Sequence, residues 1–252
     1  MHMTNSAITG DTAVMRQARG EQILAAAVAL LLEHGYRRIT MEDVAVRSGV
    51  GTGTIYLHWK SKQTLFETVL LRELVAIWGE LVQLLNDDPA NALLHRFLSH
   101  LLRAVQDRPL AQALFTRDSS LLGKLVQQST ILQTQPFGSS SALITTLRDL
   151  GLMRTDLPPA VQAYAFSAIW AGFSLVDPLL AGTDHTPIDL QIAALTLTIR
   201  RTFEPEYPPD TAILQAQIAP ALQQFLSQTQ AIFMQQIQAR MLAVPNRDDQ
   251  LR

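Results

Sequence analysis

Apolar residues recur at helical spacing along nearly all of this 252-residue chain, and short breaks of Pro, Gly, Asn and Asp separate the apolar segments. This pattern predicts a series of amphipathic helices. No stretch of the sequence shows the apolar–polar alternation of a half-buried strand, and no internal repeat is evident. Aromatic residues make up only 6% of the chain, which also favours helix over strand. We therefore expect an all-α fold.

Composition excludes several classes of protein. Hydrophobic residues make up 48% and charged residues 17% of the chain, so bulk disorder is excluded, and the length allows one large or two modest domains. Cysteine is absent, which excludes disulfides, a thiolate nucleophile and a Cys-ligated zinc site. The polar start of the chain lacks the pattern of a signal peptide, and we expect a cytoplasmic protein. The uncharged stretch Leu157–Val176 predicts a buried helix, with a transmembrane span as the alternative.

The breaks divide the chain into expected helices. They cover Val14–His34, a short segment from the Thr40 cap to Ser48, a second short segment within 50–59, Lys62–Leu85, Ala90–Asp107, Pro109–Phe115, Ser119–Gln133, Phe137–Leu150, Pro158–Leu180, Ile188–Phe203 and Asp210–Val244. The last of these carries a long apolar stripe, so we expect it to pack on the body of the protein. The alternative is a flexible, Gln-rich extension.

Charge is distributed unevenly along the chain. Residues 1–62 carry a net charge of +2, whereas the remainder carries −4. A basic amino-terminal part on an acidic body indicates that an anionic partner binds at the amino-terminal end.

The two short segments together predict a helix-turn-helix. Thr40 and Asp43 stand at the spacing of a capping box, and Gly49 ends the first short helix. In a helix-turn-helix the second helix enters the major groove of DNA, and its first residues meet the base edges. Gly51 and Gly53 would let the backbone approach closely. Ordinary roles remain open for the residues that follow: Tyr56 and Trp59 could pack between helices, and His58 could be an exposed histidine.

Resemblance to a known family strengthens this interpretation. The segment ITMEDVAVRSGVGTGTIYLHWKSKQTLF (residues 39–66), with ILAAA at 23–27 and EHGY at 33–36, closely resembles the DNA-binding domain of TetR-family transcriptional regulators. The resemblance extends over about Arg19–Leu70. It departs from the family pattern at Gly51, where Ser is common, and in the residues after Pro205, where family members of ordinary length tend to stop.

The resemblance implies two functional parts: a three-helix helix-turn-helix domain and a carboxy-terminal helical domain for ligand binding and dimerisation. We place a flexible tail at 1–15, the DNA-binding domain at 16–62, the helical domain at 63–205 and an additional helix and tail at 206–252. Thr40 and Tyr56 would touch phosphates, residues 52–54 would face the groove, and Lys62 would clamp the backbone. The full set of expected DNA-binding residues is Thr40, Arg47, Gly51, Thr52, Gly53, Thr54, Tyr56, His58, Lys60 and Lys62.

The family also implies a homodimer and an internal ligand pocket. The segments Pro158–Leu180 and Ile188–Phe203 would form a four-helix interface with a second copy, although both could instead be core helices of a monomer. Aromatic residues are the candidate pocket lining, although packing is their commonest role. These candidates are Trp78, Phe97, Phe115, Phe137, Phe166, Trp170 and Phe173.

The expected function is that of a ligand-responsive transcriptional regulator, more specifically a repressor that a small apolar effector releases from a palindromic operator. We find no pattern for a metal, a cofactor or a catalytic triad, and we expect no enzymatic activity and no membrane partner. His95 and His100 are five residues apart and do not share a helix face. The alternatives are an all-helical enzyme, or a protein-interaction module, with an appended helix-turn-helix.

Overall fold

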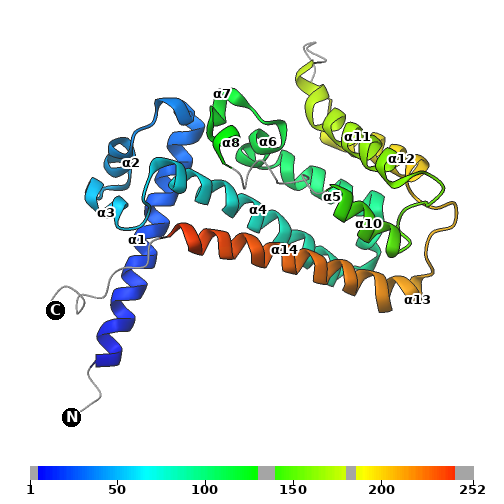
Figure 1. The fold of residues 1–252 in the computed structure, drawn as a ribbon, viewed down its shortest axis with the longest axis horizontal. Helices are drawn as coiled ribbons and strands as arrows, with labels where there is room; N and C mark the ends of the chain where they lie inside the picture. Colours follow the sequence, from blue (N-terminus) through cyan, green and yellow to red (C-terminus); the bar gives the residue numbers. More distant parts are fainter. Residues whose placement is uncertain (1–4, 130–139, 180–185, 242–252) are drawn as a thin grey trace.

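The computed structural model describes residues 5–129, 140–179 and 186–241, and every regular element in these ranges is helical (Figure 1). The expected all-α fold is therefore confirmed. The elements are α1 (Asn5–His34), the 3₁₀ turn η1 (Tyr36–Arg38), α2 (Met41–Ser48), α3 (Thr52–Tyr56), α4 (Lys62–Asp87), the 3₁₀ turn η2 (Pro89–Ala92), α5 (Leu94–Gln106), α6 (Pro109–Thr116), α7 (Ser119–Leu122), α8 (Leu125–Gln128), α10 (Ser140–Asp149), α11 (Pro159–Leu179), α12 (Ile188–Thr202), α13 (Thr211–Ile213), the π-helical segment η3 (Leu214–Ile218) and α14 (Ala219–Arg240).

Helix α1 is longer than the sequence pattern predicts. It begins at Asn5 rather than at Val14, so residues 5–15, which we expected as a flexible tail, are helical. Extending an existing helix requires no new nucleation, which explains how a weakly patterned segment can continue a strong one. The second half of α1 supplies the core of the amino-terminal part, where Ile23, Ala27 and Leu31 are fully buried.

Two expected helices are interrupted. The predicted helix Ser119–Gln133 is divided into α7 and α8 because Gly123 adopts φ 55°, ψ −129°, a conformation that ends a helix; its last residues lie outside the described ranges. The predicted helix Ala90–Asp107 begins as η2 and restarts as α5 after Leu93, which is extended at ψ 132°.

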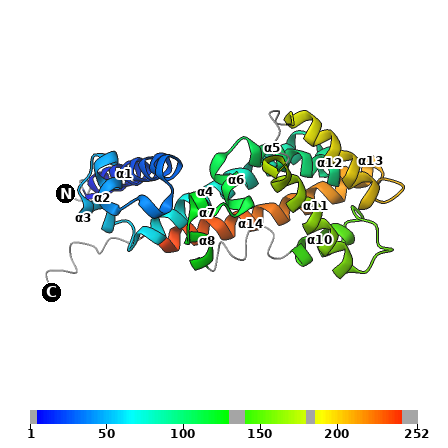
Figure 2. The same ribbon diagram turned by 90° about the horizontal axis from the view of Figure 1, so that it is seen from above.

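Helices α4 and α14 form the long axis of the molecule (Figures 1 and 2). They run in opposite directions and pack along one another, so the carboxy-terminal helix packs on the body as we predicted. The predicted helix Asp210–Val244 is divided into α13, η3 and α14, and its last residues, 242–244, lie outside the described ranges. Leu222, Leu226 and Phe233 of α14 are buried. The segment η3 precedes Pro220, which has no amide hydrogen to donate to the preceding turn, so the chain adopts a π-helical segment there.

The loop between α6 and α8 connects the body to the amino-terminal part. Helix α7 packs on α1 and η1. Gly35 has φ 71°, and a Cβ atom built on it would lie 2.8 Å from the carbonyl oxygen of Ser120. A glycine is therefore required at this position both for its backbone conformation and for the close approach of α7.

Helix α11 is less buried in the single chain than we expected for the stretch Leu157–Val176. The window Pro159–Val176 is long and apolar enough to cross a membrane by length and composition, yet only 22% of it is buried in the chain. A single such helix is weak evidence for a membrane span, because core helices pass the same test. The prediction that this segment is buried is therefore wrong for the single chain, and the exposed apolar side chains of α11 need another explanation.

Candidate nucleic-acid interface

The amino-terminal end of α2 is fixed by the predicted capping box. The Thr40 hydroxyl oxygen accepts from the Asp43 amide at 3.1 Å, and the Thr40 amide donates to the Asp43 carboxylate at 2.7 Å. These hydrogen bonds from Thr40 lower the pKa of Asp43. The Thr40 hydroxyl also donates to Asp43 at 2.8 Å, so in the free protein Thr40 already has a partner and its side chain is exposed at the helix start.

A glycine turn sets α3 across α2. Gly49 adopts φ 66°, ψ 27°, and its amide donates to the carbonyls of Ala45 and Val46. The side-chain amide of Gln22 in α1 donates to the carbonyl of Ser48 at 2.7 Å, which holds the turn against α1. The two helices and the turn therefore form the expected helix-turn-helix, anchored on α1.

The outer face of α3 is open. Gly51 and Gly53 are exposed, Thr52 and Thr54 are half-buried, and Ile55 points into the core. A Cβ atom on Gly53 would meet nothing within 4 Å, and one on Gly51 would meet only the Thr54 hydroxyl oxygen at 3.9 Å. The packing of the described residues therefore leaves room for a Cβ atom at either position.

Two aromatic groups after α3 are buried. Trp59 is fully buried, and its indole nitrogen donates to the Thr68 hydroxyl at 3.0 Å, so the expectation that Trp59 packs between helices is confirmed. His58 is only 3% exposed and stacks on Trp59 at 5.4 Å. Burial, with a contribution from Arg16 and Arg19, lowers the pKa of His58.

His58 therefore requires a correction. We expected it to reach phosphates or to be an ordinary exposed histidine, and the structure places it in the interior instead. A buried, neutral imidazole is not available to the DNA backbone. The sequence around His58 does not indicate whether its side chain is buried or exposed. Burial of His58 depends on contact with α1, which is distant in sequence.

Lys62 lies at the start of α4 beside η1. Its ammonium group donates to the carbonyl of Tyr36 and sits 4.1 Å from the centre of the Tyr36 ring. Burial lowers the pKa of Lys62, and the nearby Asp43 opposes this shift. A concave surface is formed here by Tyr36, Arg37, Lys62, Lys124 and Gln128. Arg37 and Lys124 are not among the expected DNA-binding residues, yet their side chains line this surface beside Lys62.

The remaining expected DNA-binding side chains lie in different environments. Tyr56 is 46% exposed on α3, and Lys60 is exposed in the loop before α4. Arg47 forms an ion pair with Glu33 of α1, which lowers the pKa of Glu33. Arg47 therefore ties α2 to α1 in the free protein, and a phosphate would have to compete with Glu33 for it.

The candidate pocket residues are spread over the body. Phe97 and Phe166 are core residues, and Phe115 packs against Trp170 with ring centres 6.2 Å apart. Phe173 is half-buried against the same core. Trp78 faces the carboxy-terminal helix, where it stacks on Phe233 at 6.5 Å, and Phe137 lies outside the described residues. Among the described candidates, Phe115 and Trp170 thus lie in contact and Trp78 lies against α14. A ligand pocket lined by these residues stays a prediction.

Comparison with known proteins supports the interpretation of the amino-terminal part. Residues 23–69 match the family model described as bacterial regulatory proteins, tetR family. The chain is 26% identical over 119 residues to the HTH-type transcriptional repressor KstR2 of Mycolicibacterium smegmatis, covering 46% of this chain and 58% of that one. It is 31% identical over 133 residues to the repressor KstR of the same organism, covering 49% and 65%. The matches thus span less than two thirds of either relative.

Solved structures share the fold over a larger part of the chain. A FadR transcriptional regulator from Bacillus subtilis, solved in complex with stearoyl-CoA, has a TM-score of 0.52 at 16% identity and covers 71% of this chain and 96% of its own. A transcriptional regulator from Saccharomonospora viridis, solved in complex with choline, has a TM-score of 0.52 at 21% identity and covers 74% and 97%. With its helix-turn-helix, its matching family model and its repressor relatives, the amino-terminal part of this chain is a DNA-binding domain of the TetR family of transcriptional regulators.

Proposed function

We propose that this chain is a transcriptional repressor that binds a palindromic operator as a homodimer, in the cytoplasm, and is released from it by a small apolar effector. The observation that carries the DNA-binding part is the open face of α3. Glycine inside a helix costs about 1 kcal/mol relative to alanine. Gly53 bears this cost, yet a Cβ atom there would meet no atom of the described residues within 4 Å. Close approach of a major-groove surface explains why the position has no side chain.

The dimer part of the proposal rests on the exposed faces of α11 and α12. Ala168, Ala171 and Gly172 of α11 are not buried, and a Cβ atom on Gly172 would meet nothing. Exposed apolar side chains of this kind are typical of a protein–protein interface, and two copies of one chain are needed to read two half-sites. The large apolar side chains on this face are Val161, Tyr164, Leu175, Val176, Leu190 and Leu197.

The effector part of the proposal rests on the composition of the body. Phe97, Phe115, Phe166 and Trp170 pack there, and the FadR of the same fold was solved in complex with stearoyl-CoA. Binding of an apolar molecule beside α4 would change the relative placement of the two DNA-binding domains. Coupling between two sites is typically ~1–3 kcal/mol.

Because such coupling is reciprocal, operator DNA is expected to weaken binding of the effector by the same factor by which the effector weakens binding of the operator, roughly 5- to 150-fold. Calorimetric titration of a long-chain acyl-CoA, an amphipathic ligand with a long apolar chain, without and with operator gives the ligand affinity of the free and of the operator-bound protein. Equal affinities in the two titrations would show that the ligand is not the inducer.

Lys62 provides a test of the phosphate contacts. We expect Lys62→Ala to weaken binding to all duplex sequences alike, because a phosphate contact carries no sequence information. The slope of log affinity against log salt concentration should become shallower by about 0.9 for each phosphate group that the variant no longer neutralises. Anisotropy titrations at several salt concentrations measure this slope. An affinity unchanged at every salt concentration would remove Lys62 from the interface.

A further inference from the structure

The carboxy-terminal helix spans the molecule from the far end of α4 to the DNA-binding domain. At the far end, Gln223 of α14 donates to the side chain of Asn86 at 2.5 Å. In the middle, Gln230 donates to the carbonyl of Val75 at 3.0 Å, beside Gly79, where a Cβ atom would lie 2.8 Å from the Gln230 nitrogen. Side-chain hydrogen bonds therefore fix the register of α14 on α4.

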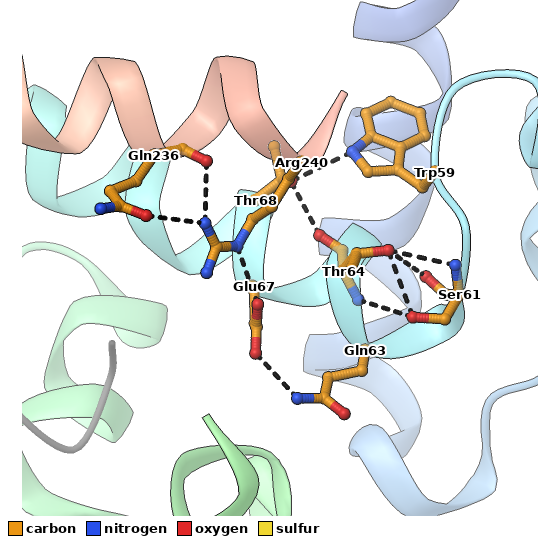
Figure 3. Close-up of polar contacts among 8 residues, drawn as sticks. All are labelled: Trp59, Ser61, Gln63, Thr64, Glu67, Thr68, Gln236 and Arg240. Carbon is orange, nitrogen blue, oxygen red and sulfur yellow. Dashed lines mark hydrogen bonds and ion pairs between the residues drawn. The ribbon is translucent and has the colours of Figure 1, made fainter. Parts of the chain in front are cut away.

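At the near end, α14 closes on α4 with a buried ion pair. Arg240 donates from Nε to the Glu67 carboxylate at 2.8 Å, and the two side chains are only 12% and 8% exposed (Figure 3). Arg240 also donates to the carbonyl and side-chain oxygens of Gln236 at 2.8 and 3.1 Å. Gln63 donates to the other oxygen of Glu67 at 2.9 Å. Both oxygens of the carboxylate are therefore occupied, and the guanidinium is held in place by its own helix.

The turn of α4 that carries Glu67 also forms hydrogen bonds with the residues that follow α3. Thr68 accepts from the Trp59 indole and donates to the carbonyl of Thr64 at 2.8 Å. Thr64 in turn donates its amide to the Ser61 hydroxyl at 3.2 Å in the cap of α4 (Figure 3). Trp59 follows α3 by three residues. A continuous series of contacts therefore links Arg240, through Glu67 and the adjacent Thr68, to Trp59, three residues after α3.

A second contact joins the end of α14 to α1. The terminal methyl of Met241 lies 3.8 Å from the position that a Cβ atom on Gly20 would occupy. The end of α14 therefore touches both α1 and α4, the two helices on which the helix-turn-helix rests.

We propose that Arg240 is a positioning residue for DNA recognition, which holds Glu67 and thereby fixes the orientation of α3 relative to the body. This inference rests on the proposed DNA-binding function. Loss of one partner of a buried ion pair leaves an uncompensated charge, which would loosen the first turns of α4. If only a fraction of molecules then holds α3 correctly, the apparent operator affinity falls in proportion to that fraction.

The test compares Arg240→Met, which keeps most of the aliphatic stem, with Gln223→Ala, which removes a hydrogen bond at the opposite end of the same helix. We expect Arg240→Met to lower operator affinity about 10-fold, Gln223→Ala to leave it unchanged, and Arg240→Lys to restore part of it. Hydrogen exchange of the amides of residues 52–68 should become faster in Arg240→Met alone. Unchanged affinity together with unchanged exchange would overturn the proposal.

A second variant distinguishes a positioning role from simple unfolding of Arg240→Met. The double variant Glu67→Gln/Arg240→Met has no unpaired buried charge, so it should fold, yet it lacks the ion pair and should still bind operator more weakly than the unaltered protein. Operator affinity equal to that of the unaltered protein would contradict a positioning role. If the unaltered protein fails to bind DNA at all, the proposed function fails, while the exchange comparison still decides whether Arg240 holds α3.

Discussion

The Ala168→Glu/Ala171→Glu variant is expected to sediment as a single chain, whereas the unaltered protein is expected to sediment as a pair. Both alanines are exposed in the single chain, so the substitutions leave the protomer fold intact. In the dimer each carboxylate would be buried against a second copy without a partner, at an effective cost of several kcal/mol per charge. Loss of the second half-site should also lower operator affinity by roughly 100-fold or more.

Ala231→Glu is the control for this experiment, because it introduces a glutamate at an exposed position of α14. We expect this control to sediment and to bind operator as the unaltered protein does. A dimer that persists in the double variant would place the interface elsewhere on the molecule.

The Gly53→Leu variant is expected to bind operator 10- to 100-fold more weakly while folding at least as stably as the unaltered protein. A Cβ atom at this position meets nothing within 4 Å among the residues that the structure describes, and replacing a helical glycine with leucine should add up to about 1 kcal/mol of stability. The added side chain would instead displace α3 from the groove and break base contacts worth ~1–3 kcal/mol each. Thermal unfolding and operator titration measure the two effects separately.

Gln224→Leu adds the same side chain at an exposed position of α14 and serves as the control. It should leave operator affinity unchanged. A Gly53→Leu variant that binds operator normally would show that α3 does not approach DNA closely, and one that unfolds would show that the glycine has a structural role.

Local hydrogen bonding explains which elements could be predicted from the sequence. The caps at Thr40 and Ser61 join residues three apart, and Gly49 ends α2 through contacts within one turn. These features decide the start of α2, the turn and the start of α4 without reference to the rest of the chain. The boundaries of the helix-turn-helix were accordingly predicted well.

Long-range packing explains what the sequence pattern missed. His58 is buried by residues of α1, and Arg240 meets Glu67 across 173 positions of sequence. Helical periodicity identifies which face of a helix is apolar. It does not identify which other element of the protein covers that face. The same limit accounts for α11, whose apolar face indicated a buried helix although much of that face is exposed in the single chain.

The most direct test of the proposed repressor function is an anisotropy titration of the protein against the duplex upstream of its own gene and against a scrambled duplex of equal length, at one fixed salt concentration. We predict saturable binding of two chains per palindromic site, with an affinity at least about 1000-fold higher than for the scrambled duplex. Equal affinity for the two duplexes would contradict sequence-specific recognition by α3.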